Sequence, residues 1–429
     1  MRSLKRRESV MPLDTPPGYY SFNEDSVCAF LDSLPDIRTR LGGKPADWRV
    51  VEVGDGNLNL VFLIDGPEGS VCLKQALPYV RAAGESWPLP LDRAFFEQAY
   101  YRAVASSVEG LTPRFYHYEP ALYAIVMEKL SPHIILRRGL IEGRRYPKVA
   151  ADVGDYAARA IFATSDLGAT IEEKAEWSSV FARNTSLLRI TAEVVFTDPL
   201  GNSPRNRWTS PALDDLAREF RADSALKTTV ADWGWRFLTE GQALIHGDLH
   251  TGSVMVTETD TRVMDPEFAI LGPIGFDVGA FLANLVMNFF AQPGHATAAD
   301  DRREQADWVL DQVPVFWNAF ATRFRSLWET KARGDAYPPA MFGAGDAAAL
   351  DAARTKFLDR VFADAVAYAG VKTIRRILGF AHNADFETIA DPAKRAPLET
   401  KSIRLARQFL LEPASFRTAE DIVAAARAV

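Results

Sequence analysis

The chain has 429 residues, and its 49 basic and 56 acidic side chains give a formal net charge of −7 at pH 7. At roughly 150 residues per domain, this length predicts two or three domains with sizeable cores. Hydrophobic residues at 48% and charged residues at 24% are typical of soluble globular proteins, and the acidic balance argues against a main role in binding nucleic acid or an anionic membrane.

The first 17 residues carry a basic cluster between residues 2 and 7 with no apolar segment behind it. We therefore expect a flexible N-terminal tail and not a signal peptide. The most apolar stretch of the chain, near residues 280–291, is interrupted by two asparagines and is expected to be too short to span a bilayer. The only cysteines, Cys28 and Cys72, cannot form a disulfide framework, which favours a reducing, cytoplasmic compartment.

Residues 18–130 have the pattern of a small β-rich lobe. Ser21 and Glu24 match a capping box that would open a helix ending near residue 34. Apolar periodicity and turn residues then divide the segment into short elements. The sequence predicts strands over 48–53, 58–64 and 71–76, a helix over 91–107, and strands over 114–119 and 122–130.

A glycine-containing loop joins the first two of these strands. Its members are Gly54, Asp55, Gly56, Asn57, Leu58 and Asn59. A dinucleotide-binding loop would follow a strand and open a helix, but strand-type residues lie on both sides of this one, so that interpretation fails. Two interpretations stay open: a loop that covers nucleotide phosphates, as in protein kinases, and an ordinary hairpin turn with an Asp-Gly step.

Lys74 lies among apolar residues in the third predicted strand. Its side chain either meets an anion or lies on a solvated face of the sheet. Glu97, on the following helix, is a candidate partner, since kinases use such a pair to direct the lysine to the nucleotide phosphates. An exposed helical glutamate is the alternative.

Beyond a link at residues 127–130 the chain becomes mainly helical. Two lobes of unlike composition predict a ligand-binding cleft between them. A strand-like patch at residues 243–265 interrupts the helices and contains the densest polar motifs, whereas the polar loop at residues 197–211 has no assignable role. Helices are expected over 149–162, 212–220, 303–328, 350–378 and 400–411.

The polar loop HGDLHTGS lies between two apolar runs of this patch and places Asp248 between His246 and His250. A carboxylate in such a loop can orient an attacking hydroxyl and accept its proton, which is the role of the catalytic-loop aspartate of kinases. We expect His246 to support the loop by hydrogen bonding. A zinc site needs three or four ligands, and the cysteines are distant in sequence, so metal-hydrolase chemistry is disfavoured.

Asp265 and Glu267 lie at the end of a short apolar run, and Asp265 is 17 positions after Asp248. In an extended chain, residues two apart point to the same side, about 6–7 Å apart. Hard oxygen ligands this close suit Mg²⁺ bridging nucleotide phosphates. A plain strand-end turn at the Asp-Pro step is the alternative, and the spacing from Asp248 favours the metal. Asp277, a few residues later, is expected to cap a helix.

Arg375 and Arg376 follow Lys372 on a late predicted helix. Adjacent helical residues point about 100° apart, and such pairs usually lie on a solvated surface. The apolar runs on both sides leave open a second possibility, a polar pocket.

In chain order, these motifs resemble those of the 5-methylthioribose kinases, a family in the aminoglycoside phosphotransferase and choline kinase branch of the protein-kinase-like fold. The resemblance covers nearly the whole chain apart from the first residues. Two features are that family's own: Ser253 stands where relatives in the wider superfamily generally carry asparagine, and an Asp-x-Glu motif replaces Asp-Phe-Gly. The motifs are the glycine loop, HGDLHTGS, the Asp-Pro-Glu-Phe-Ala run, GPIGFDVGAF and the arginine pair.

The resemblance implies an α+β, protein-kinase-like fold with a small antiparallel β-rich N-lobe at residues 18–130 and a large, mainly helical C-lobe at residues 131–429. It implies a homodimer that uses ATP and Mg²⁺ to phosphorylate the 1-hydroxyl of S-methyl-5-thioribose in methionine salvage. The implied sites are Asp248 for catalysis and sugar binding; Asp265 and Glu267 for Mg²⁺; Gly54, Asp55, Gly56, Asn57, Asn59, Lys74, Glu97, Met127, Glu128 and Leu130 for ATP; and Trp87, Arg375 and Arg376 for the sugar.

Two alternatives remain beside this function. One is a related small-molecule kinase acting on an aminoglycoside, choline or another sugar; the cationic acceptors would favour an acidic or aromatic pocket, and the arginine pair speaks against them. The other is a nucleotide-binding pseudokinase, which would be favoured by loss of Asp248 or of the metal carboxylates, and all of these are present.

Overall fold

A computed structural model describes residues 15–54, 58–80, 84–343 and 345–429. The chain divides into two compact units. The first comprises Met1–Arg102 and Pro113–Ser131, and the second comprises Ala103–Thr112 and Pro132–Val429.

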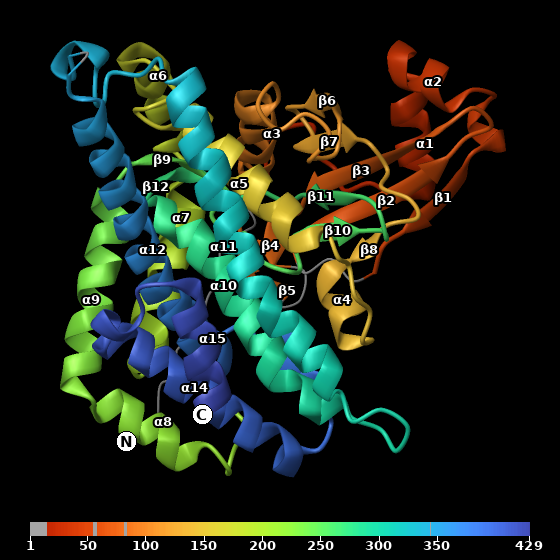
Figure 1. The fold of residues 1–429 in the computed structure, drawn as a ribbon. Helices are drawn as coiled ribbons and strands as arrows, with labels where there is room; N and C mark the ends of the chain where they lie inside the picture. Colours follow the sequence, from red (N-terminus) through yellow and green to blue (C-terminus); the bar gives the residue numbers. More distant parts are fainter. Residues whose placement is uncertain (1–14, 55–57, 81–83, 344) are drawn as a thin grey trace, which may run out of the picture. The chain divides into compact units, whose positions relative to one another are not determined.

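The first unit is built on a five-stranded antiparallel sheet with the strand order β1-β2-β3-β7-β6 (Figure 1). The central strand β3 pairs Lys74 with Val61 of β2 and with Ile125 of β7. All five predicted strands of this lobe are present. The strands are β1 Arg49–Glu52, β2 Asn59–Asp65, β3 Ser70–Ala76, β6 Phe115–Glu119 and β7 Ala124–Met127, beside a small hairpin of β4 Tyr79–Val80 and β5 Gly84–Pro88.

Helices α1 Glu24–Asp32 and α2 Pro35–Leu41 contribute to the core of this sheet, where Val27 and Leu31 join buried residues of β2, β3 and β7. The predicted capping box at Ser21 is wrong. Asn23 caps α1 instead, because its side chain accepts a hydrogen bond from the Ser26 amide at 2.8 Å and the Ser26 hydroxyl completes the box. The helix α3 Arg93–Val104 follows the hairpin.

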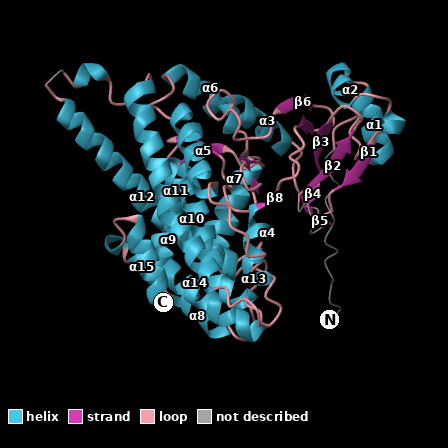
Figure 2. Ribbon diagram, turned by 45° about the vertical axis from the view of Figure 1, so that its right-hand side comes forward, coloured by secondary structure: helices cyan, strands magenta, loops and turns pink. Residues whose placement is uncertain are grey.

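The second unit is mainly helical, as Figure 2 shows, with two small antiparallel sheets. One sheet has the order β11-β10-β8 and the other pairs β12 with β9. The strands are β8 Ile134–Ile135, β9 Ala243–Ile245, β10 Val254–Val256, β11 Thr261–Val263 and β12 Ile270–Gly272. The helices are α4 Leu136–Ile141, α5 Val149–Thr164, α6 Ile171–Phe181, α7 Thr185–Thr191, α8 Asp214–Ala222, α9 Ser224–Thr239, α10 Ile274–Ala291, α11 Arg303–Lys331, α12 Ala347–Leu378, α13 Ala384–Glu387, α14 Pro392–Leu411 and α15 Ala419–Ala428.

The helix α10 forms the core of the second unit and packs against α11, α12 and α14. All of its residues except Phe289 are buried, because its sequence is apolar on every side. The expectation that this stretch is too short for a bilayer is wrong on length, since the helical segment Ile274–His295 has 22 residues. Its most apolar window is 94% buried inside the protein, which is the environment of a core helix.

Segment 197–211, which has no role predicted from sequence, is tied together by side-chain bonds. Arg205 bridges Glu193 and Asp198, at 2.8 Å to each. The carbonyl of Arg207 is 2.6 Å from Nε2 of His382, in the loop after α12. This segment therefore braces the loop that follows α12.

Candidate active site

The centre of β3 carries the first functional pair. Lys74 Nζ lies 2.6 Å from Glu97 Oε2 on α3, and the two side chains are only 11% and 1% exposed. The pairing expected from the sequence is present, and burial makes it a strong constraint on where the lysine can point. The contact of Lys74 with ATP stays a prediction.

Arg93, the first residue of α3, holds the end of the glycine loop, a role that sequence reasoning missed. Its guanidinium is buried and donates to the side-chain oxygen of Asn59 at 3.2 and 2.9 Å. It also donates to the carbonyls of Leu58 at 2.7 Å, Leu77 at 2.9 Å and Pro90 at 2.7 Å. Five donor contacts from one buried guanidinium fix the start of β2 against the end of β3.

The glycine loop itself is only partly covered by the structure. Gly54 has open space where a Cβ would lie, while Asp55, Gly56 and Asn57 fall outside the described residues. The side-chain oxygen of Asn59 is occupied by Arg93. The ATP contacts assigned to this loop therefore remain predictions.

The segment predicted to contact adenine follows β7, which lies between β3 and β6 in the sheet. Met127 is buried at the end of β7. The Glu128 amide donates to the Arg114 carbonyl at 2.8 Å, and the Glu128 carboxylate accepts from the Arg114 amide at 3.0 Å. Leu130 is half-buried, as is Trp87 on β5. Their ligand contacts also remain predictions.

In the second unit, the catalytic loop runs from His246 to Ser253 between β9 and β10. Asp277 supports it from α10, where its carboxylate accepts the amide hydrogens of His246 at 2.6 Å and Gly247 at 3.0 Å. Burial raises the pKa of Asp277, against the opposing effect of His246 and these two amides. The expectation that Asp277 caps α10 is wrong, because the residue in the cap position is Pro273 and Asp277 lies inside the first turn.

The two histidines of the loop have different partners. His246 Nδ1 accepts from the Asp248 amide at 3.3 Å and Nε2 lies 2.9 Å from the Met264 carbonyl, so the predicted supporting hydrogen bonds are present. His250 Nδ1 accepts from the Gly252 amide at 2.9 Å, which leaves Nε2 to donate to Asp248 Oδ2 at 3.2 Å. Burial lowers the pKa of His250 to about 4 despite the adjacent carboxylate, so the ring is neutral at pH 7.

Ser253 closes the loop. Its buried hydroxyl accepts from the His250 amide at 2.9 Å and lies 3.0 Å from the Asp248 carbonyl and 2.8 Å from the His250 carbonyl. The backbone from the Asp248 carbonyl to His250 is thereby fixed from within the loop.

Asp248 faces buried cations from α12. Its Oδ1 lies 3.5 Å from Lys372 Nζ and 3.9 Å from Arg376 Nη2. Burial alone would raise the pKa of Asp248, but His250, Lys372 and Arg376 outweigh it and hold that pKa well below its ordinary value. The carboxylate is therefore ionised and held on both oxygens.

The arginine pair is inside the protein and not on its surface. Arg375 and Arg376 are both buried, and each donates from Nη1 to the Ala381 carbonyl, at 3.0 and 2.9 Å. Ala381 has a φ of 55°, a left-handed conformation unusual for a residue with a side chain. The expectation that such a pair lies on a solvated surface is therefore wrong here, because α12 packs against α10 in the core of the unit.

Arg137 on α4 is a further cation that the sequence did not reveal, since no motif surrounds it. It donates to Asn284 Oδ1 at 2.9 Å and to Thr251 Oγ1 at 3.2 Å, and it lies 3.5 Å from Asp385 Oδ2. We call Arg137, Lys372, Arg375 and Arg376 the cation cluster. Three carboxylates act on these four cations, the half-buried Asp248 and the buried Asp277 and Asp385, which leaves one positive charge in excess, suited to an anionic ligand.

Asp265 and Glu267 follow β11 as predicted, and each offers a carboxylate oxygen within 4.8 Å of the other. The extended path expected between them is wrong, because Asp265 has a φ of 71°, which turns the chain. Asn184 holds this turn by donating to the carbonyls of Glu267 at 3.0 Å and Ala269 at 3.1 Å. Two hard oxygen donors at this separation fit Mg²⁺.

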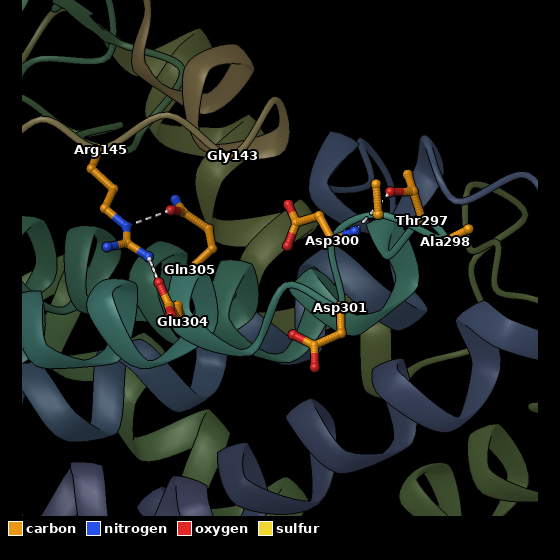
Figure 3. A pocket seen from close by; sticks show the side chains of 9 residues that line it. Gly143, Arg145, Thr297, Ala298, Asp300, Asp301, Glu304 and Gln305 are labelled. Carbon is orange, nitrogen blue, oxygen red and sulfur yellow. Dashed lines mark hydrogen bonds and ion pairs between the residues drawn. The ribbon is translucent and has the colours of Figure 1, made fainter.

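A separate hollow in the second unit lies beside the start of α11 (Figure 3). Arg145 there reaches Gln305 at 3.1 Å and Glu304 at 3.4 Å, and Asp301 pairs with Arg303 at 3.1 Å. Its lining shares no residue with the catalytic loop or the cation cluster, and it carries three acidic side chains and one basic side chain, which do not suit an anionic nucleotide. The candidate active site is therefore not in this hollow.

Comparisons with known proteins identify the family of this chain. Residues 49–311 match the model of a phosphotransferase enzyme family. A methylthioribose kinase of Escherichia coli O45:K1 is 39% identical over 416 residues, which cover 96% of this chain and 98% of the relative. Methylthioribose kinase 1 of Oryza sativa subsp. japonica is 39% identical over 409 residues, 95% of each chain. The chain belongs to the methylthioribose kinase family.

As a member of the methylthioribose kinase family, the chain is a phosphotransferase with the kinase-like α+β fold, and both expectations from the sequence are confirmed. The stretch matched by the phosphotransferase model contains Lys74, Asp248 and Asp265. Among solved structures, glucosamine kinase with glucosamine, ADP and phosphate aligns at a TM-score of 0.46 and 14% identity, covering 90% of this chain and 86% of that one. Choline kinase from Cryptosporidium parvum aligns at 0.45 and 10% identity, covering 92% and 99%. Both scores are too low to add to the assignment.

Proposed function

We propose that this chain transfers the γ-phosphoryl group of ATP to the 1-hydroxyl of S-methyl-5-thioribose, giving S-methyl-5-thioribose 1-phosphate for methionine salvage. Membership of the methylthioribose kinase family supports the acceptor. The single observation that carries the chemistry is the ionised Asp248, held on both oxygens beside the buried cation cluster. In this proposal Asp248 orients the acceptor hydroxyl, and the cation cluster compensates the negative charge of the phosphorylated product.

The nucleotide is assigned to the first unit. The Lys74–Glu97 pair presents a cation to the phosphates, with residues 54–59 over them and Met127, Glu128 and Leu130 at the adenine. In this proposal Asp265 and Glu267 would hold Mg²⁺, which would offset part of the negative charge of the phosphates. The fit of two carboxylate oxygens within 4.8 Å supports this assignment.

The acceptor is assigned to the second unit, and the assignment of Trp87, in the first unit, to the sugar rests on the family resemblance alone. The sugar 1-hydroxyl donates a hydrogen bond to Asp248, and Arg375 and Arg376 bind sugar oxygens. Because the pKa of Asp248 lies well below its ordinary value, the carboxylate is a weak base. Its main contribution is orientation, which suffices for a loose phosphoryl-transfer transition state.

The competing function is phosphorylation of a different small molecule. Cationic acceptors such as aminoglycosides and choline are disfavoured by the cation cluster, since like charges repel in a buried site. Neutral sugars are the closer rivals, and they differ from methylthioribose at the 5-position.

An ADP-release assay with methylthioribose, ribose, choline and kanamycin tests the proposal. We expect kcat/KM for methylthioribose to exceed that for every other acceptor, because an apolar methylthio group is worth about 1–3 kcal/mol in a matching pocket. Equal kcat/KM for ribose would overturn the assignment of the substrate.

The homodimer and the cytoplasmic location implied by the family resemblance belong to the same proposal, and light scattering of the purified protein tests the dimer.

A further inference from the structure

Lys372 is a buried cation on α12 that lies beside Asp248. Its side chain is 5% exposed, and its Nζ lies 3.5 Å from Asp248 Oδ1 and 4.0 Å from the centre of the Phe276 ring. Across the part of the chain that the structure describes, this ammonium has that ion pair and ring contact but no hydrogen bond. An ammonium has three donors, so Lys372 can bind the oxygen atoms of a ligand.

The charges around Lys372 indicate which kind of ligand it would bind. Asp248 faces it from the catalytic loop, Asp277 acts on it from α10, and Arg375 and Arg376 lie on its own helix. Asp277 is already hydrogen-bonded to two backbone amides. The four cations of the cluster are thus faced by three carboxylates, Asp248, Asp277 and Asp385, which leaves one positive charge uncompensated. Burying a cation without full charge compensation costs free energy. An anionic oxygen of a ligand would remove that cost if it were bound between Lys372 and the substrate hydroxyl that Asp248 orients.

The spacing along α12 explains why Lys372 and Arg376 act on the same carboxylate. They are four residues apart, so their side chains lie on one face of the helix, and both approach Asp248 Oδ1. An acceptor hydroxyl that attacks from beside Asp248 would place the γ-phosphorus near the face of α12 that carries Lys372 and Arg376. Lys372 is therefore close to the bond that forms.

We propose that Lys372 is a catalytic residue whose ammonium binds an oxygen of the phosphoryl group while it moves from the nucleotide to the acceptor. This inference rests on the proposed function. The bond between the acceptor oxygen and the γ-phosphorus forms, and the bond between that phosphorus and the bridging oxygen of ADP breaks. The hydroxyl proton passes to Asp248 and then to water, and Lys372 keeps its protons throughout.

The protonation of Lys372 supplies a distinctive signature. Burial lowers its pKa to about 8, although Asp248 acts in the opposite direction. The ammonium is therefore present below that pH and is lost above it, so activity should fall as the pH rises through this value. Arginine stays charged at any pH the enzyme tolerates.

The test compares Lys372→Met and Lys372→Arg with Lys356→Met, a control at an exposed position of the same helix. We expect Lys372→Met to lower kcat by about 10²–10³-fold, the usual cost of removing one transition-state donor, with KM for the acceptor changed less than about threefold. Lys372→Arg should keep part of kcat and shift the alkaline decline of kcat/KM to higher pH. The control should match the wild type.

Two results would overturn the inference. One is a kcat of Lys372→Met within threefold of wild type; the other is an alkaline decline that is the same in Lys372→Arg and in wild type. If Lys372→Met does not fold by circular dichroism, the Arg variant decides alone. If wild type does not phosphorylate methylthioribose, the proposed function fails, and the same variants are compared on whichever acceptor is turned over.

Discussion

Asp277 offers a sharp test of how the catalytic loop is held. Its carboxylate, buried on the core helix α10, accepts the amide hydrogens of His246 at 2.6 Å and Gly247 at 3.0 Å. The substitution Asp277→Asn keeps the shape of the side chain and one of its two acceptor oxygens. The other oxygen is replaced by an NH₂ group, which is a donor and cannot accept the hydrogen of the second backbone amide.

The magnitude follows from these two bonds. A hydrogen bond to a charged group contributes about 1.5–3 kcal/mol, and an unpaired buried donor costs about 1–3 kcal/mol. Because burial raises the pKa of Asp277, the neutral variant recovers part of the cost of burying the charge. We therefore expect a net loss of about 2–3 kcal/mol, which corresponds to a fall in Tm of about 4–8 °C for a unit of this size. Asp248 follows Gly247 directly, and a displacement of about 1 Å at a reacting group costs about 10²-fold in kcat.

Thermal unfolding by circular dichroism and the ADP-release assay measure both effects in one preparation. Asp232→Asn, at an exposed position of α9, is the matched control. A Tm and a kcat of Asp277→Asn that both equal those of the control would refute the view that Asp277 holds the loop.

Three further variants test other parts of the site. Asp248→Asn should lower turnover by about 10²–10⁴-fold and leave ATP affinity, measured by calorimetry, within about twofold; lost ATP binding would show that Asp248 has been given the wrong role. Gly247→Ala should lower Tm by several degrees, since Gly247 has a φ of 84° and a Cβ there would lie 2.2 Å from the Phe268 carbonyl oxygen; an unchanged melting curve contradicts this. Arg93→Met should destabilise the first unit by about 3–5 kcal/mol, the cost of breaking a buried polar network, and weaken ATP binding; equal resistance to proteolysis in variant and wild type would contradict it.

The strands and the catalytic loop are predictable because their signals are local. Short β-type runs mark β2 and β3, and the apolar runs on both sides of HGDLHTGS mark β9 and β10. A polar loop between two buried strands has few alternative positions. The position of Asp248 relative to its two histidines follows from the five residues His246 to His250.

The supports of the site are not predictable, because they depend on contacts distant in sequence. Asp277 is 31 residues from His246, and Arg93 is 34 residues from Asn59. The apolar runs on both sides of Arg375 and Arg376 leave open both a solvated pair and a pair in a polar pocket. Their burial follows from the packing of α12 on α10 and α14.

The helix α14 shows how tertiary contacts override local preference. The sequence predicts a helix over 400–411, but α14 begins at Pro392 and contains Pro397. Proline at the first position costs nothing, since that amide has no partner in the helix. Contacts with α10 and α12 stabilise the following turn, where Pro397 would otherwise disfavour a helix.

The central claim is that phosphate is transferred to the 1-hydroxyl of methylthioribose, and the structure of the product tests it most directly. Wild-type protein is incubated with ATP, Mg²⁺ and methylthioribose, and the product is examined by ³¹P and ¹H NMR. We expect a phosphorus signal coupled to the anomeric hydrogen and its absence with Asp248→Asn. Coupling to any other sugar position, or ADP release without a sugar phosphate, would contradict the account.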